Sequence, residues 1–296
     1  MSKEAAADFE AHRPRLFSLA YRMLGSASEA EDVVQDTYLR WSTADHSAVR
    51  TPAAWLTKVM TNLCVNQLTS ARAQRELYVG PWLPEPVLTH TGADRLGPLE
   101  TAEQRESVSF ALLSLMERLT PAERAVFVLR EAFGHSHREV AEAVGIEEAH
   151  SRQLHRRARE RLRHPRRDFD VDDAQHQKIV ERFFAATFEG DVAGLEQLLA
   201  DDVVVWADGG GQVTAARRPI TGHENVLRYL LGLGSRPETA RVRVEFAEVN
   251  GAPAAVVFAG QALLAIVVPE IREGRVDAVR TVINPDKLAF AAGQLA

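Results

Sequence analysis

Residues 121–167 read PAERAVFVLREAFGHSHREVAEAVGIEEAHSRQLHRRARERLRHPRR. Apolar residues recur in this stretch at helical spacing, and Gly145 interrupts the pattern before a second helix, which we expect from about Glu147 to Arg163. That helix would bury Leu154, Ala158 and Leu162, spaced four residues apart. A short helix, a glycine-bearing turn and a longer helix form the DNA-reading unit of many regulators. The stretch therefore predicts a helix-turn-helix.

The outer face of the second helix carries Arg152, Gln153 and Arg156, which we select as candidate contacts to base edges or phosphates. Residues 121–167 hold eleven arginines and seven acidic residues. The alternative to DNA binding is that this positive helix face is merely solvated, or that its charge balances the acidic run that follows at 168–173. His135 and His137 lie at the turn and are expected to cap a helix or contact a phosphate.

Composition limits the class of protein. The chain has 296 residues, 46% of them hydrophobic, which suits two or three domains with real cores. The net charge of −6 confines any DNA contact to local basic patches. The single cysteine, Cys64, excludes an internal disulfide and a cysteine-rich zinc site, and no convincing metal or cofactor motif is present. No signal peptide or membrane span is recognisable, so we expect a cytoplasmic protein that does not bind membranes.

The chain changes character twice. Residues 9–75 show helical patterns, with Ser28 as the expected N-cap of the helix that runs to about Trp41 and Pro52 in the first turn of the next helix. Four prolines between residues 77 and 98 predict a linker. After residue 167, two helical patterns precede five strands rich in valine and isoleucine, with a hairpin turn at 272–274. This order predicts an all-helical front joined to an α+β tail.

The front resembles the extracytoplasmic-function sigma factors of bacterial RNA polymerase over nearly all of residues 9–164. The stretch AEDVVQDTYLRW at 30–41 is similar to the family's region 2.2, and AAWLTKVMTNLCVNQLTSARAQRE at 53–76 to the region that binds and melts the −10 element. The resemblance implies core RNA polymerase, through its β′ clamp helices, and promoter DNA as partners. It implies polymerase contacts by Glu31, Asp32, Gln35 and Asp36, and −10 contacts by Trp55, Lys58, Asn62 and Asn66.

Their residue types suit these roles. Asp32, Gln35 and Asp36 share one face of the expected helix, while Val33, Val34 and Leu39 can turn inward, although an acidic, solvated face is an equal alternative. Trp55 could replace lost base stacking or anchor the core. Asn66 and Thr69 depart from the family's usual residues. The helix-turn-helix corresponds to region 4, which reads the −35 element, and Ser151 stands there in place of a more usual apolar residue.

Three separated motifs resemble the subgroup whose tail is a SnoaL-like domain, an α+β conical barrel. They are WLPEP at 82–86, DGGG at 208–211, where Gln212 replaces a frequent lysine, and NPDKL at 284–288. DGGG beside a strand end suits the close approach of another segment or a ligand. The regulatory residues so implied are Trp82, Leu83, Pro84, Glu85, Pro86, Asp208, Gly209, Gly210, Gly211, Asn284, Pro285, Asp286, Lys287 and Leu288.

We therefore expect sigma region 2 at 1–75, a linker at 76–104, sigma region 4 at 105–167 and the SnoaL-like domain at 174–296. The leading hypothesis is a sigma factor, not an enzyme, whose tail modulates its activity through the linker. One alternative is a tail that binds a small molecule or acts as an enzyme, with Asp208 as the carboxylate and Asp286 or His223 as partners. A repressor that works without polymerase is a third hypothesis.

Overall fold

The computed structural model describes residues 3–89, 96, 102–162, 173–236 and 241–296. The chain forms two compact units. Unit 1 comprises Met1–Leu77 and Thr91–His164, and unit 2 comprises Tyr78–His90 and Pro165–Ala296. Both units are therefore discontinuous in sequence. Most of the described part of the expected linker belongs to the same unit as the tail.

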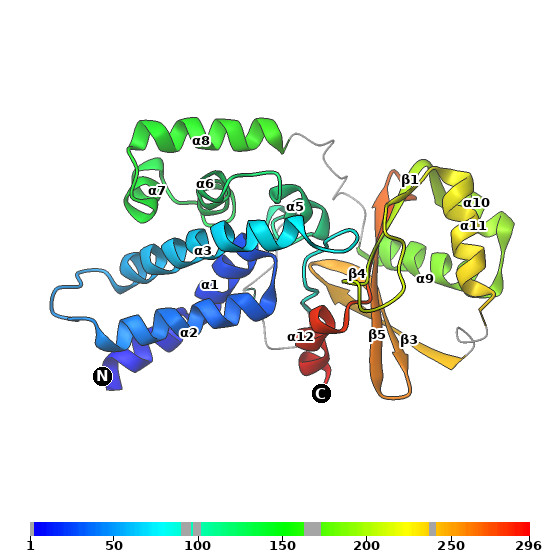
Figure 1. Ribbon diagram of the computed structural model, residues 1–296, viewed down its shortest axis with the longest axis horizontal. Coiled ribbons are helices and arrows are strands. Elements are labelled where there is room, and N and C mark those ends of the chain that lie inside the picture. The colour runs from blue at the N-terminus through cyan, green and yellow to red at the C-terminus, as the bar shows by residue number, and fades with distance from the viewer. Residues whose placement is uncertain (1–2, 90–95, 97–101, 163–172, 237–240) are drawn as a thin grey trace. The chain divides into compact units, whose positions relative to one another are not determined.

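Unit 1 is helical in its described part, as predicted (Figure 1). Its elements are α1 (Lys3–Leu24), α2 (Ala27–Thr43), α3 (Pro52–Glu76), α4 (Ala102–Glu106), α5 (Phe110–Met116), α6 (Pro121–Glu131), α7 (His137–Val144) and α8 (Glu148–Arg161). Helices α1, α2 and α3 pack together, and α6, α7 and α8 form the helix-turn-helix. Helix α3 packs directly against α6 and α7.

Local signals explain where these helices begin and end. Helix α7 begins at a capping box of Ser136 and Glu139, and Gly145 ends it in the left-handed region at φ 78°. The N-cap of α2 is Ser26, whose side chain accepts from the Glu29 N–H, so the expectation of Ser28 was wrong. The sequence offers serines at both positions, and only the extended backbone at Ser26 decides between them.

Two further expectations need correction. Leu39 does not turn inward with its neighbours on α2, because 55% of its surface is exposed. Helix α8 ends at Arg161, and Leu162 is its half-buried C-cap rather than a core residue. The expected end of that helix at Arg163 lies outside the described residues.

Unit 2 is α+β, as predicted. Its elements are α9 (Asp173–Glu189), α10 (Val192–Leu198), β1 (Leu199–Asp208), β2 (Ile220–Thr221), α11 (His223–Gly234), β3 (Val242–Val249), β4 (Ala252–Ala259), β5 (Ala262–Arg272), β6 (Arg275–Val282) and α12 (Pro285–Leu295). The strands form one sheet in the order β2-β1-β6-β5-β4-β3. Strands β1 and β6 are parallel, and the other pairs are antiparallel.

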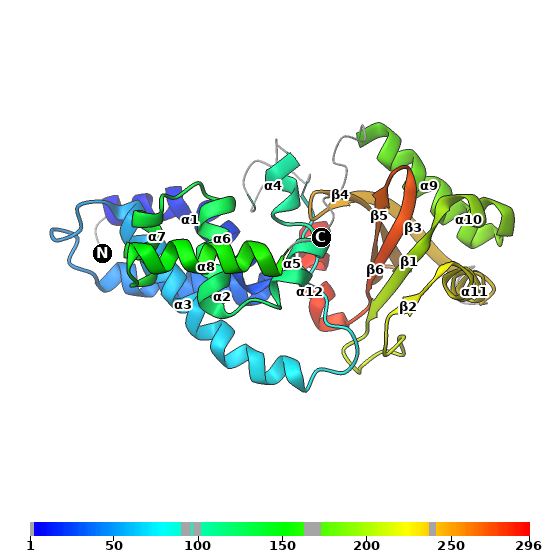
Figure 2. The same cartoon turned by 90° about the horizontal axis from the view of Figure 1, so that it is seen from above.

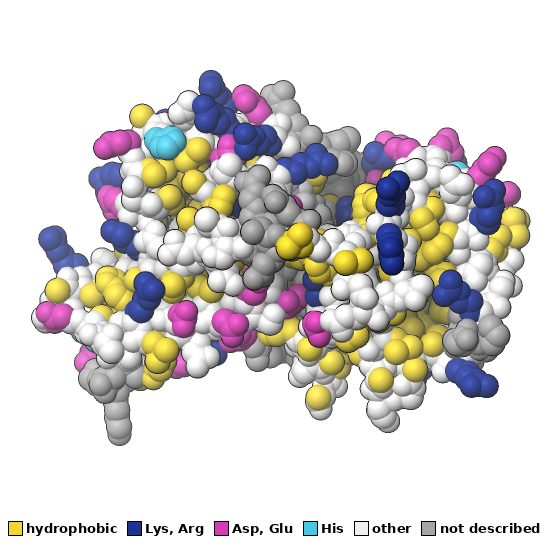
Figure 3. Space-filling view, in the orientation of Figure 1, with side chains coloured by type: hydrophobic (Ala, Val, Ile, Leu, Met, Phe, Trp, Pro, Cys, Tyr) yellow, Lys and Arg dark blue, Asp and Glu magenta, His cyan; other side chains and the backbone are white. Residues whose placement is uncertain are grey.

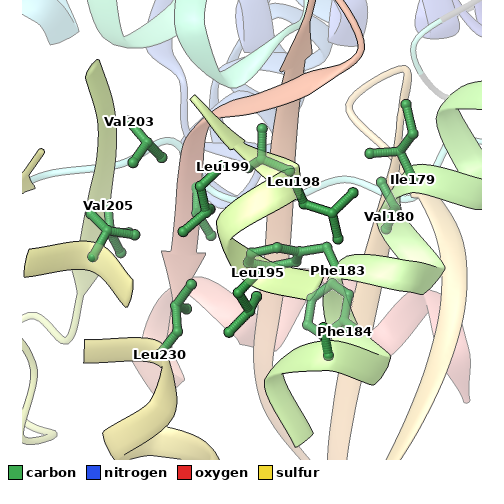
Figure 4. Close-up of a cluster of buried hydrophobic side chains, with 14 of the residues drawn as sticks. Ile179, Val180, Phe183, Phe184, Leu195, Leu198, Leu199, Val203, Val205 and Leu230 are labelled. Atoms are coloured by element: carbon green, nitrogen blue, oxygen red, sulfur yellow. The ribbon is translucent and has the colours of Figure 1, made fainter. Parts of the chain in front are cut away.

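Helices α9, α10 and α11 cover one face of this sheet, and α12 lies on the opposite side (Figures 1 and 2). Figure 4 shows the apolar cluster between the three helices and the sheet, to which Phe183, Leu195, Leu230 and Val205 contribute. Every member of this cluster is hydrophobic. Burial of these side chains stabilises unit 2 and holds the ends of β1 and β6 in fixed positions.

Two tight turns set the register of the β3–β6 meander. Glu273 and Gly274 have φ values of 52° and 75°, which is the geometry of a hairpin turn at the position predicted from the sequence. Asn250 and Gly251 form the same kind of turn between β3 and β4, with φ values of 53° and 71°. The second turn also contacts Val87, which accepts from the Asn250 backbone N–H and donates its own N–H to the Asn250 side-chain oxygen.

Candidate functional site

The three motifs of the linker and tail meet at Asp208, the last residue of β1. Asp208 is fully buried, and both of its carboxylate oxygens accept hydrogen bonds. One bond comes from the backbone N–H of Leu83 in WLPEP, at 2.8 Å. Another comes from the N–H of Gly210, at 3.1 Å, within DGGG itself. A buried carboxylate thus fixes the linker to the end of a strand.

Lys287 of NPDKL supplies the positive charge at this position. Its Nζ lies 2.7 Å from Asp208 Oδ2 and donates a second hydrogen bond to the carbonyl oxygen of Leu83, at 2.5 Å. The ammonium group also lies over the rings of Trp82 and Tyr78, 4.3 Å and 4.7 Å from their centroids. One lysine therefore neutralises the carboxylate and binds the linker through its backbone and its aromatic side chains.

Tyr78 closes the site from the other end of the segment. Its hydroxyl donates to Asp208 Oδ1 and accepts from Asn284 Nδ2, at 3.0 Å. Burial raises the pKa of the Tyr78 phenol, and the hydrogen bond to Asp208 raises it further. Tyr78 therefore stays protonated near neutral pH and remains a donor to the carboxylate.

The glycines of DGGG let these groups approach closely. Gly210 has a φ of 58°, and a Cβ atom there would collide with the amide of Asn284 and crowd the Tyr78 hydroxyl. Asn284 in turn caps α12 by accepting from the Asp286 N–H. Gln212 donates to Asp286, so the residue that replaces the frequent lysine bonds to NPDKL rather than to Asp208.

A second set of contacts holds the following residues of the segment against β3 and α12. Val87 exchanges backbone and side-chain hydrogen bonds with Asn250 at the hairpin turn, and Leu88 forms a bridge with Val249. The side-chain amide of Gln294 bonds both backbone groups of Leu88. Leu83, Val87 and Leu88 are all buried. The segment from Tyr78 to Thr89 is thus docked along most of its length.

The remaining regulatory candidates lie close to this site but have different surroundings. Pro84, Glu85 and Pro86 are buried with the segment, and Leu288 is buried in α12. Pro285 and Asp286 are exposed in the first turn of α12. Gly209 is buried, and a Cβ atom there would strike the backbone oxygen of Val213.

The helix-turn-helix presents its predicted contacts to solvent. Arg152, Gln153 and Arg156 are all exposed on α8. Arg152 pairs with Glu148, and Arg156 with Glu160, in ordinary surface ion pairs one turn apart, which contribute little stability and release easily. Figure 3 shows basic side chains gathered over α8. The arginines at 163, 166 and 167 lie outside the described residues.

The candidate −10 residues lie along α3. Lys58 and Asn66 are exposed, and Trp55 and Asn62 are partly buried. The Trp55 ring lies 5.3 Å from that of Trp41, which is buried and donates to the backbone of Ala5. Trp55 therefore has one side anchored on the core and another open to solvent. The contact with Trp41 fits the core-anchor alternative, and the base-stacking role stays a prediction.

The candidate polymerase contacts lie on α2. Asp32, Gln35 and Asp36 are exposed, while Val33 and Val34 are buried. Glu31 is half-buried and pairs with Arg13 of α1 at 3.1 Å. Three of the four residues therefore point outward from one helix, and the fourth is already engaged within the unit.

Two buried arginines join α1 to the helix-turn-helix side of unit 1. Arg124 of α6 donates to the backbone oxygens of Met23 and Met116, at 2.8 and 3.1 Å, and pairs with Glu117 at 2.7 Å. Arg22 donates to Ser107 at 2.9 Å, and burial lowers its pKa to about 10. These bonds tie α1 to α6 and to the residues before α5 through buried polar groups, and both helices also carry buried apolar residues.

Family models match three parts of the chain: sigma-70 region 2 at residues 9–74, sigma-70 region 4 at 109–162 and the SnoaL-like domain at 180–286. The ECF RNA polymerase sigma factor SigJ of Mycobacterium tuberculosis is 38% identical over 289 residues, which cover 95% of this chain and 92% of that one. The chain belongs to the extracytoplasmic-function sigma factors. The probable sigma factor SigI of the same species is 31% identical, with 96% and 94% covered.

The crystal structure of SigJ from M. tuberculosis agrees with this assignment. It is 35% identical in sequence, superposes with a TM-score of 0.75, and covers 96% of this sigma factor and 98% of its own chain. The predicted family and fold class are thus confirmed. No described helix of this sigma factor is long and apolar enough to cross a membrane. The described residues contain no cluster of histidine, cysteine, aspartate or glutamate that could hold a metal ion.

Sequence reasoning missed several residues of the docking site. Tyr78 lies just upstream of WLPEP, and Asn250, Gln294 and Glu248 bind the segment downstream of it. The Asn-Gly pair at 250–251 between two strands was a readable turn signal, but nothing in the sequence connects it with the linker. Gln294 and Glu248 carry no local signal at all.

The three residues of the enzyme alternative have different surroundings. Asp208 is buried beneath the linker, Asp286 bonds to Gln212, and His223 lies at the start of α11 with its Nε2 3.3 Å from the Glu196 carbonyl oxygen. The layer between the helices and the sheet is apolar.

Proposed function

We propose that this sigma factor directs promoter-specific initiation by binding core RNA polymerase through α2 and promoter DNA through α3 and α8. The exposed residues Asp32, Gln35 and Asp36 would meet the β′ clamp helices, with Glu31 beside them. Trp55, Lys58, Asn62 and Asn66 of α3 would read the −10 element, and Arg152, Gln153 and Arg156 of α8 the −35 element. Such a protein acts in the cytoplasm, where polymerase and promoters are.

Geometry requires unit 1 to open during this process. Elements centred at −10 and −35 lie about 25 base pairs apart, or roughly 85 Å along B-form DNA. In the structure α3 packs directly against α7, and packed helices have axes about 8–10 Å apart. The closed unit therefore cannot place α3 and α8 on both elements at once. Opening must separate α3 from α6 and α7, and α1 from α6.

The docked segment gives the tail control over this opening. The single observation that carries the proposal is the burial of Asp208 between Lys287 and the Leu83 N–H, which fixes the linker to the tail. With Tyr78–Thr89 docked, residues 90–101 alone connect the segment to α4, and twelve residues can span at most about 43 Å. Docking thus shortens the tether between the two DNA-reading parts.

We therefore assign the tail an inhibitory role while the segment is docked. A tail that bound the segment equally well in the closed and open arrangements would shift nothing, so its affinity must favour the closed one. Polymerase and promoter binding would draw the segment away from Asp208. A small-molecule ligand of the tail remains an alternative trigger, since anything that competes for Lys287 or Asp208 would have the same effect.

Run-off transcription with purified core polymerase tests the proposal. Full-length protein, Asp208→Asn and a version ending near Asp168 should all give promoter-specific transcripts, and Asp208→Asn should give more than the full-length protein. Exposed Asp201 on β1 offers the matched control, and Asp201→Asn should behave as the parent does. Without core binding and transcripts, the enzyme and repressor hypotheses would take precedence. Equal activity of parent and Asp208→Asn would remove the regulatory part alone.

A further inference from the structure

A polar contact joins the two helices of the helix-turn-helix where an apolar one is usual. His137 is the first residue of α7, and its Nδ1 lies 3.0 Å from the hydroxyl oxygen of Ser151 in the first turn of α8. Ser151 is fully buried. It occupies the position at which the sequence departs from the family's apolar preference. The unusual serine therefore has a specific polar partner, His137.

The contact continues one helical turn further along α8. The His155 ring meets the His137 ring edge-on, with centroids 5.5 Å apart, and His155 Nε2 lies 2.6 Å from Glu131 at the end of α6. Four polar side chains thus link α6, α7 and α8 beneath the recognition helix. Ser151 and His155 are four residues apart and share the inner face, while Arg152 and Gln153 follow Ser151 on the outer face.

A set of linked polar side chains fixes the position of one helix against another more sharply than an apolar contact does. A hydrogen bond fixes both the distance and the direction between its two atoms, and a buried donor or acceptor left unpaired costs about 1–3 kcal/mol. An apolar pair at the same place would tolerate sliding and rotation of α8 with little loss. The register of α8 against α7 is therefore set at its first turn, next to the residues that face outward.

We propose that His137 and Ser151 are positioning residues for −35 recognition, which hold the first turn of α8 so that Arg152 and Gln153 meet the base edges. This inference rests on the proposed role of α8 in reading the −35 element. Neither residue needs to contact DNA. Their effect is on discrimination between sequences, because phosphate contacts depend less on the exact register of the helix than base contacts do.

The same contact makes recognition sensitive to acid. Burial lowers the pKa of His137, and Arg130 on α6 together with His155 and Arg152 on α8 lowers it further, while Glu148 opposes them. The folded protein thus favours neutral His137. The contribution of this preference to the stability of the fold is present above the ordinary histidine pKa of about 6.5 and is lost as the pH falls below that value. Protonation would place another cation beside Arg152.

The test uses full-length protein with core polymerase and two promoter fragments that differ only in a scrambled −35 element. Affinity for each is measured at pH 8.0 and pH 6.0 at constant ionic strength. The variants are His137→Ala, Ser151→Ala, the double variant, and His137→Asn, which keeps a hydrogen-bonding atom near the Nδ1 position but does not titrate. His12 on α1, which is partly buried and bonds the Asp8 carbonyl oxygen of its own helix, supplies the control, His12→Asn.

We expect His137→Ala and Ser151→Ala each to reduce the preference for the intact −35 element about fivefold, as the loss of one hydrogen bond would. The double variant should be no worse than either single one, and His137→Asn should retain the preference while losing the pH dependence of the parent.

Full preference in Ser151→Ala, additive losses, or equal weakening on both fragments would overturn the positioning role. A parent without any −35 preference would instead refute the proposed function. Thermal unfolding identifies misfolded variants, and His137→Asn and Ser151→Ala are small enough changes to decide the question.

Discussion

Asp208 shows what one carboxylate can organise when it is buried. Its oxygens meet a phenol, two backbone N–H groups and a lysine, which come from three separate parts of the sequence. Because Asp208 and Lys287 are both buried, each partner depends on the others, and removing one charge leaves the other buried without compensation. Single substitutions here should therefore act on the whole docked segment.

The Asp208→Asn substitution tests this dependence. It removes the charge that balances Lys287 while keeping the shape of the side chain, and we expect the C-terminal unit to lose about 3 kcal/mol of unfolding free energy. Hydrogen exchange of the Leu83 amide should accelerate. Chemical denaturation and exchange mass spectrometry measure both effects. Unchanged protection of the segment at 78–89 would contradict the central place of Asp208.

Gly210 makes the second prediction at this scale. Gly210→Ala must keep a positive φ and place a methyl group against Asn284, so it should cost more than about 1 kcal/mol and lower Tm by several degrees. Gly232 in α11 is the matched control because a Cβ atom there meets nothing within 4 Å. Gly232→Ala should leave Tm equal or higher, since alanine favours helix. Similar losses in both variants would show that the close approach at Gly210 is unimportant.

At the scale of elements, the docked segment behaves as an added edge strand. Leu88 bridges Val249, and Thr89 bonds Glu248 through both backbone and side chain, so β3 gains a short antiparallel partner at its end. This covers part of an otherwise open sheet edge. The prolines before Val87 are tolerated because the segment forms isolated bonds there rather than a continuous ladder.

Leu88→Pro should break this pairing, because proline removes the N–H that binds Gln294 and disfavours the bridge. We expect limited proteolysis to cut within residues 78–90 at least ten times faster than in the parent. Gln294→Ala removes the partner but leaves the backbone intact, and should give an intermediate rate. Equal rates for all three proteins would mean that the segment is held by the Asp208 end alone.

The contact between α1 and α6 carries a prediction of its own. Arg124→Lys cannot make all three bonds of the guanidinium group, and it should destabilise unit 1 by about 2 kcal/mol. Exposed Arg118 nearby is the control, and Arg118→Lys should be neutral. Denaturant titration measures the stability, and promoter binding with core polymerase should be maintained or improved in Arg124→Lys. Loss of promoter binding with unchanged stability would assign Arg124 to recognition instead.

At the scale of the whole molecule, the division into units cuts across the order of the sequence. The segment Tyr78–His90 lies between two parts of unit 1 along the chain, yet belongs to the same unit as the tail. Residues 91–164 are therefore tied to unit 2 at both ends. Any change in docking must affect the reach of the helix-turn-helix.

Two truncated versions separate the loss of the whole tail from the loss of α12 alone. A version ending near Asp168 leaves Leu83, Val87 and Leu88 without the tail that covers them, and should be more prone to association at high concentration. A version ending just before Asp286 keeps the sheet but lacks Lys287 and Gln294, and should release the segment while unit 2 stays folded. Sedimentation and run-off transcription compare them. Identical transcription by both versions and the parent would exclude control by the tail.

The sequence by itself determined the family, the fold class and the surface helices of this sigma factor. Helical spacing, the turn at Gly145 and the arginines of α8 are local signals, because a helix reads residues three and four apart. The hairpin at 272–274 was readable for the same reason. These features depend on residues that are close together in the sequence, and they can therefore be predicted without knowledge of the rest of the fold.

Only the tertiary structure decided what Asp208 contacts, why Ser151 is tolerated and which serine caps α2. The partners of Asp208 come from Tyr78, Leu83 and Lys287, which no periodicity connects, and Asn250 and Gln294 join them only because β3 and α12 pack beside the segment. Ser151 is acceptable because α7 brings His137 against it. Buried polar groups need partners in space, and contacts between distant residues form only when the core has fixed the elements that carry them.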